Sequence, residues 1–323
     1  MNTNAMSFPG AIAGPAASES AWHEARRRCI GASEAAAALG LSPYMTRREL
    51  YHRKRGELPP TDDTLATRRG RYFEPWIVDE YKHATAARIL AYPCRHYTLA
   101  DYPHIGATPD AIVAHGQAAA FPLEAKRPGW RRAADFGPDG SDEIPVDYAC
   151  QAQQQMLITG ADRCDVAAMF DAETLHVYTV RRSERLISAI IEAETDLWER
   201  IQTGRPPAID YTHANALDLA KSLYPVDEAR TIDLSADGLE LWRQLRKTRD
   251  AQRDAEKRAD ALEAELRELM AGASIARFPR GKAYLEIRQY PPALYTQADV
   301  EEIAAKIGQV KRRAYSRLSQ KET

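Results

Sequence analysis

Cysteine and histidine are too few and too scattered in this sequence to indicate a metal or redox centre built from them. The 323 residues include four cysteines, none of them in a Cys-x-x-Cys pair, and eight histidines with no paired ligand spacing. Zinc and iron–sulfur sites draw their ligands from such pairs, so the sequence argues against both. We expect the cysteines to be reduced thiols.

Long apolar runs are also missing. No stretch approaches the roughly 20 apolar residues that a membrane-spanning helix needs. The first twenty residues have neither a basic cluster nor an apolar core, so they do not resemble a secretory signal. We expect a disordered tail over residues 1–20 and a cytoplasmic location. The pattern Gly-x4-Gly-Lys-Ser/Thr is absent as well, which disfavours a P-loop motor.

The chain has no overall excess of positive charge, since its formal net charge is −2. Bulk charge therefore gives no sign of a polyanionic partner, although charge can be segregated on one face of a protein. Local basic clusters occur at residues 26–28, 47–55, 126–132 and 311–313. Each cluster taken alone is typical of a solvated helix face.

Hydrophobic periodicity predicts an α/β domain over residues 21–205. The predicted helices are Ala21–Leu39, Thr46–Arg55, Thr64–His83, Pro145–Thr159 and Ser183–Gln202. The predicted strands are short and separated by Gly and Pro, at residues 91–100, 105–107, 111–114, 121–125, 163–170 and 174–180. This order of helices and strands is typical of a mixed central sheet flanked by helices.

Residues 206–323 are predicted to form a C-terminal extension. Apolar or small residues recur there with the alternating four-and-three spacing of a heptad pattern, at positions 241, 245, 248, 252, 255, 259, 262, 266 and 269. We expect a long helix over residues 237–272, followed by a small hairpin or helix, with the hairpin at Ala276–Tyr290 turning at Pro279–Gly281. Because the middle of the heptad pattern is weak, an antiparallel partner within the chain is as compatible with it as a dimer.

Two acidic residues and a lysine lie on neighbouring predicted strands. Asp110 ends the segment Ile105-Gly-Ala-Thr-Pro-Asp110, and Glu124 follows fourteen residues later in Leu123-Glu-Ala-Lys126. Because successive side chains of a strand point to opposite faces, Glu124 and Lys126 share a face. A hairpin between the two strands would bring the Asp110 carboxylate beside that of Glu124.

Paired carboxylates of this kind suit a hard divalent cation, which relieves their mutual repulsion. Mg²⁺ binds in proteins through one or two carboxylates together with substrate phosphate. Lys126 would then stand beside the attacking water and offset the charge that develops on the phosphate. Glu74, on the preceding predicted helix, could complete the shell of ligands.

Taken alone, the Glu-x-Lys pattern is weak, because it arises by chance about once in a chain this rich in charged residues. The motifs around it make the signal specific. They are, in chain order, Trp22-His23 with Ile30-Gly-Ala-Ser-Glu34, Gly70-Arg-Tyr-Phe-Glu74-Pro75, Ala107-Thr-Pro-Asp110, Leu123-Glu-Ala-Lys126, and Tyr148-Ala-Cys-Gln151-Ala-Gln153-Gln-Gln-Met156 with Thr159-Gly160. Together they resemble, over residues 22–180, the lambda-type exonucleases, also called YqaJ-like viral recombinases, of the PD-(D/E)xK nuclease superfamily.

The resemblance implies a PD-(D/E)xK restriction-endonuclease-like α/β core with a C-terminal helical extension. It also implies a metal-dependent DNA exonuclease that degrades linear double-stranded DNA 5′→3′ in phage-type homologous recombination. The catalytic residues would be Glu74, Asp110, Glu124, Lys126 and Gln151. The metal ligands would be Asp110, Glu124, Glu74 and the backbone carbonyl of Ala125, holding Mg²⁺, with Mn²⁺ as a substitute.

The resemblance further implies a pocket for a 5′-phosphate, built from Arg26, Ser33, Thr108 and Gln151. A guanidinium fork, two hydroxyls and an amide are suitable donors to phosphate. Ser33 is also compatible with an ordinary helix serine, and which of the consecutive arginines 26–28 faces the pocket stays open. The implied partners are double-stranded DNA ends, a single-strand annealing protein and, as a trimer, further copies of the chain. A phage-encoded member would act in the bacterial host cytoplasm.

Two other functions remain open on the sequence. One is an endonuclease or repair nuclease on the same fold. The other is a non-catalytic DNA-end-binding or assembly module in which the heptad helix is the working part, and the presence of all the acidic ligands disfavours it. The loop that carries Arg131 and Arg132 has no role that the sequence assigns.

Overall fold

The computed structural model describes residues 6–14, 24–59, 64–171, 174–227, 231–277, 284–290 and 315–321. The chain divides into two compact units, residues 1–227 and 228–323. The first unit extends past the predicted domain boundary at residue 205, because Arg48 donates to the Pro207 carbonyl (2.9 Å) and a His213 ring nitrogen bonds the Ser42 carbonyl (3.0 Å).

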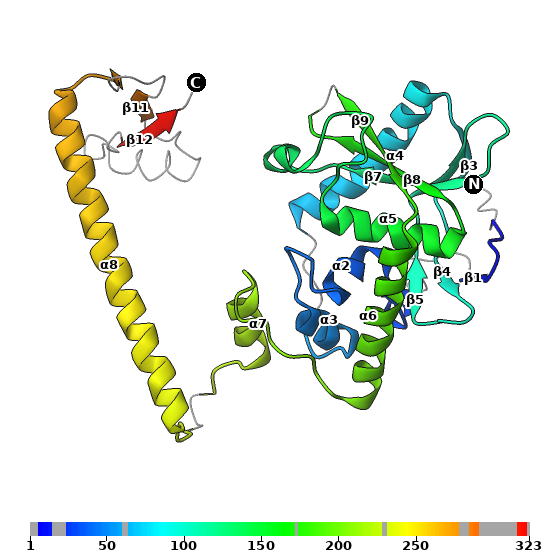
Figure 1. Ribbon diagram of the computed structural model, residues 1–323, viewed down its shortest axis with the longest axis horizontal. Coiled ribbons are helices and arrows are strands. Elements are labelled where there is room, and N and C mark those ends of the chain that lie inside the picture. Colours follow the sequence, from blue (N-terminus) through cyan, green and yellow to red (C-terminus); the bar gives the residue numbers. More distant parts are fainter. Residues whose placement is uncertain are drawn as a thin grey trace, which may run out of the picture. The chain divides into compact units, whose positions relative to one another are not determined.

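Two sheets form the framework of the first unit (Figure 1). The larger sheet has the order β3-β6-β7-β8-β9, and its strands are β3 (Arg88–Ala91), β6 (Ala111–Ala114), β7 (Phe121–Lys126), β8 (Arg163–Met169) and β9 (Leu175–Arg181). Strands β7 and β8 are parallel and the other neighbours antiparallel, so the sheet is mixed. The smaller sheet has the order β1-β4-β5-β2, with β1 (Ala11–Ala13), β4 (Tyr97–Leu99), β5 (Ile105–Ala107) and β2 (Ile30–Gly31).

Helices α4 (Leu65–Thr85) and α5 (Val146–Thr159) pack on opposite faces of the larger sheet. The alternation of side chains along the paired strands β7 and β8 shows this directly. The Tyr81 hydroxyl of α4 donates to Asp165 of β8, whereas Gln155 of α5 donates to Glu124 of β7. Asp165 pairs with Leu123, the residue before Glu124, so the side chains of Asp165 and Glu124 point to opposite faces of the sheet. Helix α6 (Glu184–Thr203) packs on α5.

Shorter helices that the structure describes in the first unit include η1 (Ala32–Glu34), α2 (Ala35–Ala38), α3 (Arg47–Lys54), η2 (Trp130–Asp135) and α7 (Ala216–Leu223). Apolar side chains from α4, α5 and the larger sheet form the main core, including the fully buried Leu123, Val166 and Met156. Each such side chain stabilises the fold by about 1.5–3 kcal/mol through burial. The mixed sheet flanked by helices confirms the predicted fold class.

The predicted continuous helix Ala21–Leu39 was wrong. Residues 24–27 are helical, but the chain then becomes extended at β2, where Ile30 pairs in parallel with Ile105 of β5. Two features favour the break: Ile30 is fully buried, and the Gly31 N–H makes a local hydrogen bond to the Glu34 carboxylate (2.7 Å). Helical propensity gives way here to strand pairing, as it often does when packing opposes it.

Part of the predicted disordered tail is also ordered. Residues Ala11–Ala13 form β1, which pairs antiparallel with β4, and Phe8 packs edge-on against Tyr97 at a ring separation of 5.1 Å. Apolar burial of one aromatic ring explains why this segment is held. The predicted single strand over 91–100 is instead two strands, because β3 belongs to the larger sheet and β4 to the smaller one.

The second unit contains the long helix α8 (Ala236–Met270), close to the predicted range 237–272. Strands β10 (Ile275–Arg277), β11 (Tyr284–Tyr290) and β12 (Tyr315–Lys321) form an antiparallel sheet. The pairing of β10 with β11 agrees with the predicted hairpin, whose turn at Pro279–Gly281 lies outside the described residues. Among the residues that are described, no helix is both long and apolar enough to cross a membrane.

A buried acid ties α6 to α5 and to the smaller sheet. The Gln154 amide nitrogen donates to the carbonyls of Ile30 (3.0 Å) and Gly106 (2.9 Å), and the Glu194 carboxyl lies 3.3 Å from the same nitrogen. Glu194 is fully buried, and burial raises its pKa well above the usual value, with the nearby Glu34 adding to the shift. Within the described residues, Glu194 Oε1 and Gln154 Oε1 have no hydrogen-bond partner. A protonated Glu194 is neutral and has one O–H donor, so it needs fewer hydrogen-bond donors around it than an ionised carboxylate would.

Replacing Glu194 with Gln should stabilise the protein at about pH 8 and much less at about pH 5. The folded state keeps the Glu194 proton above the ordinary carboxyl pKa of 4.5, whereas the unfolded chain loses it there. The free energy of unfolding of the wild type therefore falls as the pH rises above that value, and a glutamine does not titrate. The melting temperatures of both proteins, measured at the two pH values, test this. Glu192→Gln, at an exposed position of α6, is the matched control, and an equal gain from Glu194→Gln at both pH values would contradict it.

Candidate active site

The hairpin of β6 and β7 places Asp110 beside Glu124. Ala111 pairs with Leu123, so Asp110, which directly precedes β6, comes level with Glu124. The Ala125 N–H donates to Asp110 Oδ2 at 2.7 Å, which fixes the carboxylate against the backbone of β7. Neighbouring strands thus bring together the two acidic residues that the sequence placed fourteen positions apart.

The Glu124 carboxylate is almost fully buried and accepts three hydrogen bonds. Oε1 accepts from the Lys126 ammonium (2.5 Å) and from the Gln151 amide (2.5 Å), and Oε2 accepts from the Gln155 amide. Gln151 and Gln155 lie one turn apart on α5, so both face β7. Donors from a strand and a helix together compensate a charge that burial would otherwise penalise.

Lys126 is held as a cation. Burial lowers the pKa of its ammonium, but Glu124 and Asp110 raise it, and the net shift is upward. The ammonium also donates to Gln151 Oε1 (3.0 Å) and lies 4.9 Å from the centre of the Tyr148 ring. A lysine with a raised pKa cannot serve as a base at neutral pH, so it contributes positive charge and N–H donors.

The negative charge of Glu124 acts on the carboxyl groups of both Glu74, on α4, and Asp110. Burial raises the pKa of both carboxyls, the charge of Glu124 raises it further, and Lys126 opposes the shift. The predicted catalytic residues Glu74, Asp110, Glu124 and Lys126 thus interact electrostatically in one region of the first unit. Burial and a neighbouring carboxylate both favour the neutral form of a carboxyl group, whereas a nearby cation would favour the charged form.

The chemistry of these donors fits a hard divalent cation, although the side chains do not form a preassembled cage. Within the described residues, no group of three or more His, Cys, Asp or Glu side chains lies close enough together to hold a metal. The oxygens of Glu124 and one oxygen of Asp110 are engaged with protein donors. Ala125 contacts Asp110 through its N–H, and the role predicted for its carbonyl stays a prediction.

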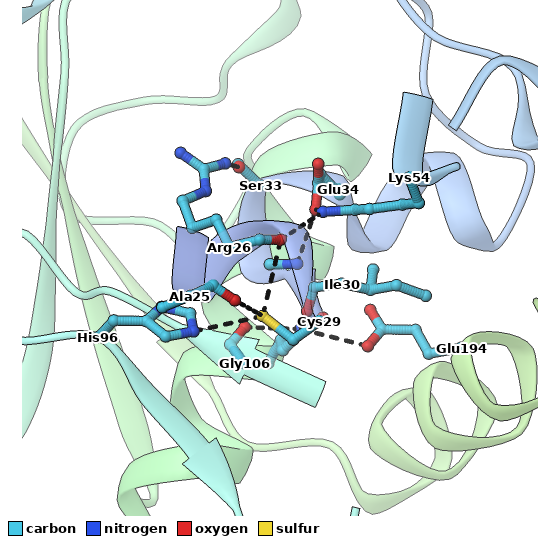
Figure 2. Close-up of polar contacts among 12 residues, drawn as sticks. Ala25, Arg26, Cys29, Ile30, Ser33, Glu34, Lys54, His96, Gly106 and Glu194 are labelled. Atoms are coloured by element: carbon cyan, nitrogen blue, oxygen red, sulfur yellow. Dashed lines mark hydrogen bonds and ion pairs between the residues drawn. The ribbon is translucent and has the colours of Figure 1, made fainter. Parts of the chain in front are cut away.

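The four residues of the predicted phosphate pocket contact different neighbours. Arg26 and Ser33 meet, with Nη2 of the guanidinium 3.0 Å from the serine Oγ, as Figure 2 shows. Lys54 of α3 supports this pair, since its ammonium donates to the Arg26 carbonyl (2.9 Å) and forms an ion pair with Glu34 (2.6 Å). Of the consecutive arginines 26–28, therefore, Arg26 is the one that contacts Ser33, whereas Arg28 pairs with Glu24.

Thr108 and Gln151 contact other groups. The Thr108 hydroxyl lies 3.0 Å from His96 Nδ1, and His96 Nε2 lies 3.2 Å from the Cys29 thiol. Burial, followed by the charge of Arg26, lowers the pKa of His96 to about 4, so the imidazole is neutral. Gly106 allows this packing, because a Cβ there would come within 2.7 Å of the Cys29 sulfur (Figure 2). Gln151 belongs with Glu124 and Lys126.

The structure adds residues that the sequence reasoning left out of the site. Gln155 is one, although its helical spacing from Gln151 was a usable signal. Arg132 of η2, which follows β7, forms a two-pronged ion pair with Asp147 (3.0 and 3.1 Å) and lies 4.8 Å from the centre of the Tyr148 ring. This contact holds η2 near the Tyr148 ring that Lys126 also contacts. No local pattern pairs Arg132 with Asp147, so the sequence alone could not assign it.

Comparisons with known proteins indicate which family and which solved structures the chain is similar to. Residues 21–162 match the family model of the YqaJ-like viral recombinase domain. The chain is 24% identical over 262 residues to the uncharacterized protein YqaJ of Bacillus subtilis (strain 168), covering 78% of each chain. A crystal structure of an alkaline exonuclease from Laribacter hongkongensis is 21% identical, with a TM-score of 0.44, and covers 62% of this chain and 98% of its own. The complex of that exonuclease with dAMP has the same identity and coverage and a TM-score of 0.46.

Gln155→Leu should lower the free energy of unfolding by about 1–3 kcal/mol, because it leaves a buried oxygen of Glu124 without its donor at nearly constant side-chain volume. Urea denaturation measures this. The control is the same substitution in a Glu124→Leu background, where no carboxylate remains to be satisfied and the loss should be much smaller. Equal losses in the two backgrounds would show that Gln155 does not stabilise the Glu124 carboxylate.

Proposed function

We propose, from the premise that residues 21–162 form a YqaJ-like viral recombinase domain, that this chain is a divalent-metal-dependent exonuclease of linear double-stranded DNA. The observation that carries the proposal is the grouping of Glu124, Lys126 and Asp110 on the adjoining ends of β6 and β7. Paired acidic residues with a lysine on the same strand face suit hydrolysis of a phosphodiester, which needs both metal ligands and a positive charge at phosphorus.

Asp110, Glu124 and Glu74 are the residues that would hold the metal, with the Ala125 carbonyl as a further oxygen ligand. A bound Mg²⁺ or Mn²⁺ would lower the pKa of a water and offset negative charge on the attacking and leaving oxygens. The raised pKa values of Asp110 and Glu74 support this assignment, because crowded carboxylates gain most from a nearby cation.

Lys126 and Gln151 would act at the scissile phosphate. The Lys126 ammonium, held by Glu124 and placed over the Tyr148 ring, would offset the charge that builds up on the phosphate oxygens. Gln151 contacts both members of the ion pair, so it would keep the ammonium and the carboxylate in a fixed relation. Both side chains belong to rigid elements, which favours a preorganised site.

Arg26, Ser33 and Thr108 would recognise a DNA end. Gln151, which contacts Glu124 and Lys126, would also contribute to this recognition. The contact of Arg26 with Ser33, and the support that Lys54 gives to the Arg26 backbone, place a guanidinium beside a hydroxyl, as phosphate binding requires. A pocket for the 5′-phosphate would make the degradation run 5′→3′. We further propose a role in phage-type homologous recombination in the cytoplasm, beside a single-strand annealing protein.

Incubation with three DNA substrates tests the activity. We expect loss of linear 5′-phosphorylated duplex in the presence of Mg²⁺, with nicked and closed circles left intact, and no loss in EDTA. Asp110→Asn should abolish the activity, because the amide keeps the side-chain volume and removes a charged ligand. A label at either the 5′ or the 3′ terminus of the linear duplex reports the direction of degradation.

Each other outcome of this experiment assigns a different function. Cutting of closed circles would make the protein an endonuclease or repair nuclease. Binding of DNA ends without degradation of any substrate would make it an end-binding or assembly module.

Lys126→Met should lower turnover by about 10²–10³-fold and leave the affinity for duplex ends nearly unchanged, because a group that offsets transition-state charge acts on kcat. Single-turnover digestion and end binding in Ca²⁺ separate the two quantities. Lys82→Met, at an exposed position of α4, removes the same charge away from the site and serves as the control. Substantial activity in Lys126→Met would show that the lysine is structural.

A further inference from the structure

Helix α8 carries an apolar stripe that is open to solvent. Its heptad positions Leu241, Leu245, Leu262 and Leu269 expose between 47% and 82% of their surface. Leu266 is half-buried and Met270 is buried, so the unit covers the stripe in part at its C-terminal end. Exposed leucines that repeat every three and four residues on one helix are typical of a helix that packs against another helix.

The stripe has a nearly symmetric composition along the helix. Leucines occupy both ends, at Leu241 and Leu245 and again at Leu262, Leu266 and Leu269. Small or polar residues fill the middle, at Thr248, Gln252, Ala255 and Ala259. A helix that reads alike from either end can pair with a copy of itself in the reverse direction, leucine against leucine.

Charge distinguishes the two directions of pairing. Residues 243–249 contain four basic side chains and no acidic one, and residues 260–268 contain four acidic side chains and one basic one. A parallel pair would place the basic segment against the basic segment and the acidic segment against the acidic segment, so like charges would flank the apolar stripe. An antiparallel pair places the basic segment of one helix along the acidic segment of the other, and charges that flank a heptad stripe set partner choice and orientation in this way.

We propose that α8 is a homodimerisation helix that pairs antiparallel with α8 of a second copy of this chain. The register that best matches the stripe is centred between residues 253 and 254. It forms leucine layers near each end, Leu245 with Leu262 and Leu241 with Leu266 of the second copy, and places Thr248 against Ala259 and Gln252 against Ala255 in the middle. Arg249 then lies beside Glu256 of the second copy.

This inference goes beyond the proposed nuclease function and does not depend on it. The 35-residue helix is about 52 Å long, which accommodates four leucine layers separated by a closer approach at the small residues. The interface is built from the second unit, so it would add to any assembly that the first unit forms.

The oligomeric state of the full-length chain tests the dimer. Light scattering coupled to size exclusion should give a mass for Leu245→Glu that is half that of the wild type, because a charge replaces an apolar side chain in the stripe. Leu239→Glu is the matched control, since Leu239 is exposed on the same helix and lies off the stripe, and it should keep the wild-type mass. Circular dichroism confirms that both variants remain helical. Equal masses for the wild type and Leu245→Glu would overturn the proposal.

Disulfide formation tests the orientation. A protein with Leu245→Cys mixed with one carrying Leu262→Cys should give a cross-linked heterodimer, because the two positions share a layer only in the antiparallel register. Leu245→Cys alone should not cross-link to itself, since its copies would lie about 25 Å apart along the axis. Among the natural cysteines, Cys29, Cys150 and Cys164 are buried and Cys94 is partly buried, so the introduced thiols are the more accessible ones. Self-cross-linking of Leu245→Cys would overturn the antiparallel assignment.

Discussion

A buried carboxylate that is satisfied by three donors is the interaction on which the first unit's central site depends. Removing an ion from water costs several kcal/mol unless partners replace the lost hydration. The partners of Glu124 come from its own strand, at Lys126, and from the facing helix, at Gln151 and Gln155. The register of β7 and the rotation of α5 must therefore both be correct before the carboxylate is satisfied. Any chemistry at Glu124 relies on that same arrangement, so stability and function at this site are coupled.

On the opposite face of the sheet, a second buried acid is likewise compensated by donors from a neighbouring strand and a helix. Asp165 of β8 is buried and accepts hydrogen bonds from the hydroxyls of Tyr81 (2.6 Å) on α4 and Thr179 (2.9 Å) on β9. Strands β7 and β8 are direct neighbours, so each face of the sheet's centre carries one buried acid linked to the helix that covers it. Hydrogen bonds, which are directional, fix the helix positions more tightly than apolar contact alone. The position of α4 in turn determines how close Glu74 lies to the charge of Glu124, which raises the pKa of Glu74 together with burial.

Local patterns in the sequence were sufficient for the elements that the periodicity of their own residues determines. Helices α4, α5 and α6 begin and end within two residues of their predicted limits, and the β6–β7 hairpin joins Asp110 to Glu124 as the spacing indicated. The break at Ile30–Gly31 was missed, because it depends on a strand and on the Gln154 amide, both distant in sequence. The sequence indicated that Arg26 and Ser33 lie together, as their contact shows, but it could not indicate that Thr108 bonds His96. Contacts between distant segments, and not local helix or strand propensity, determine both the break at Ile30–Gly31 and the Thr108–His96 hydrogen bond.

The balance of charge at the site bears on the ion that it would accept. Glu74, Asp110 and Glu124 carry three negative charges when all are ionised, and Lys126 carries one positive charge. Two negative charges then lack compensation, and the charge of Glu124 adds to burial in raising the pKa values of Glu74 and Asp110. A monovalent cation would leave one negative charge uncompensated, whereas a divalent cation would neutralise both. Oxygen donors favour hard ions such as Mg²⁺ over zinc, for which nitrogen and sulfur ligands are preferred. Charge and ligand type would therefore both suit a divalent cation.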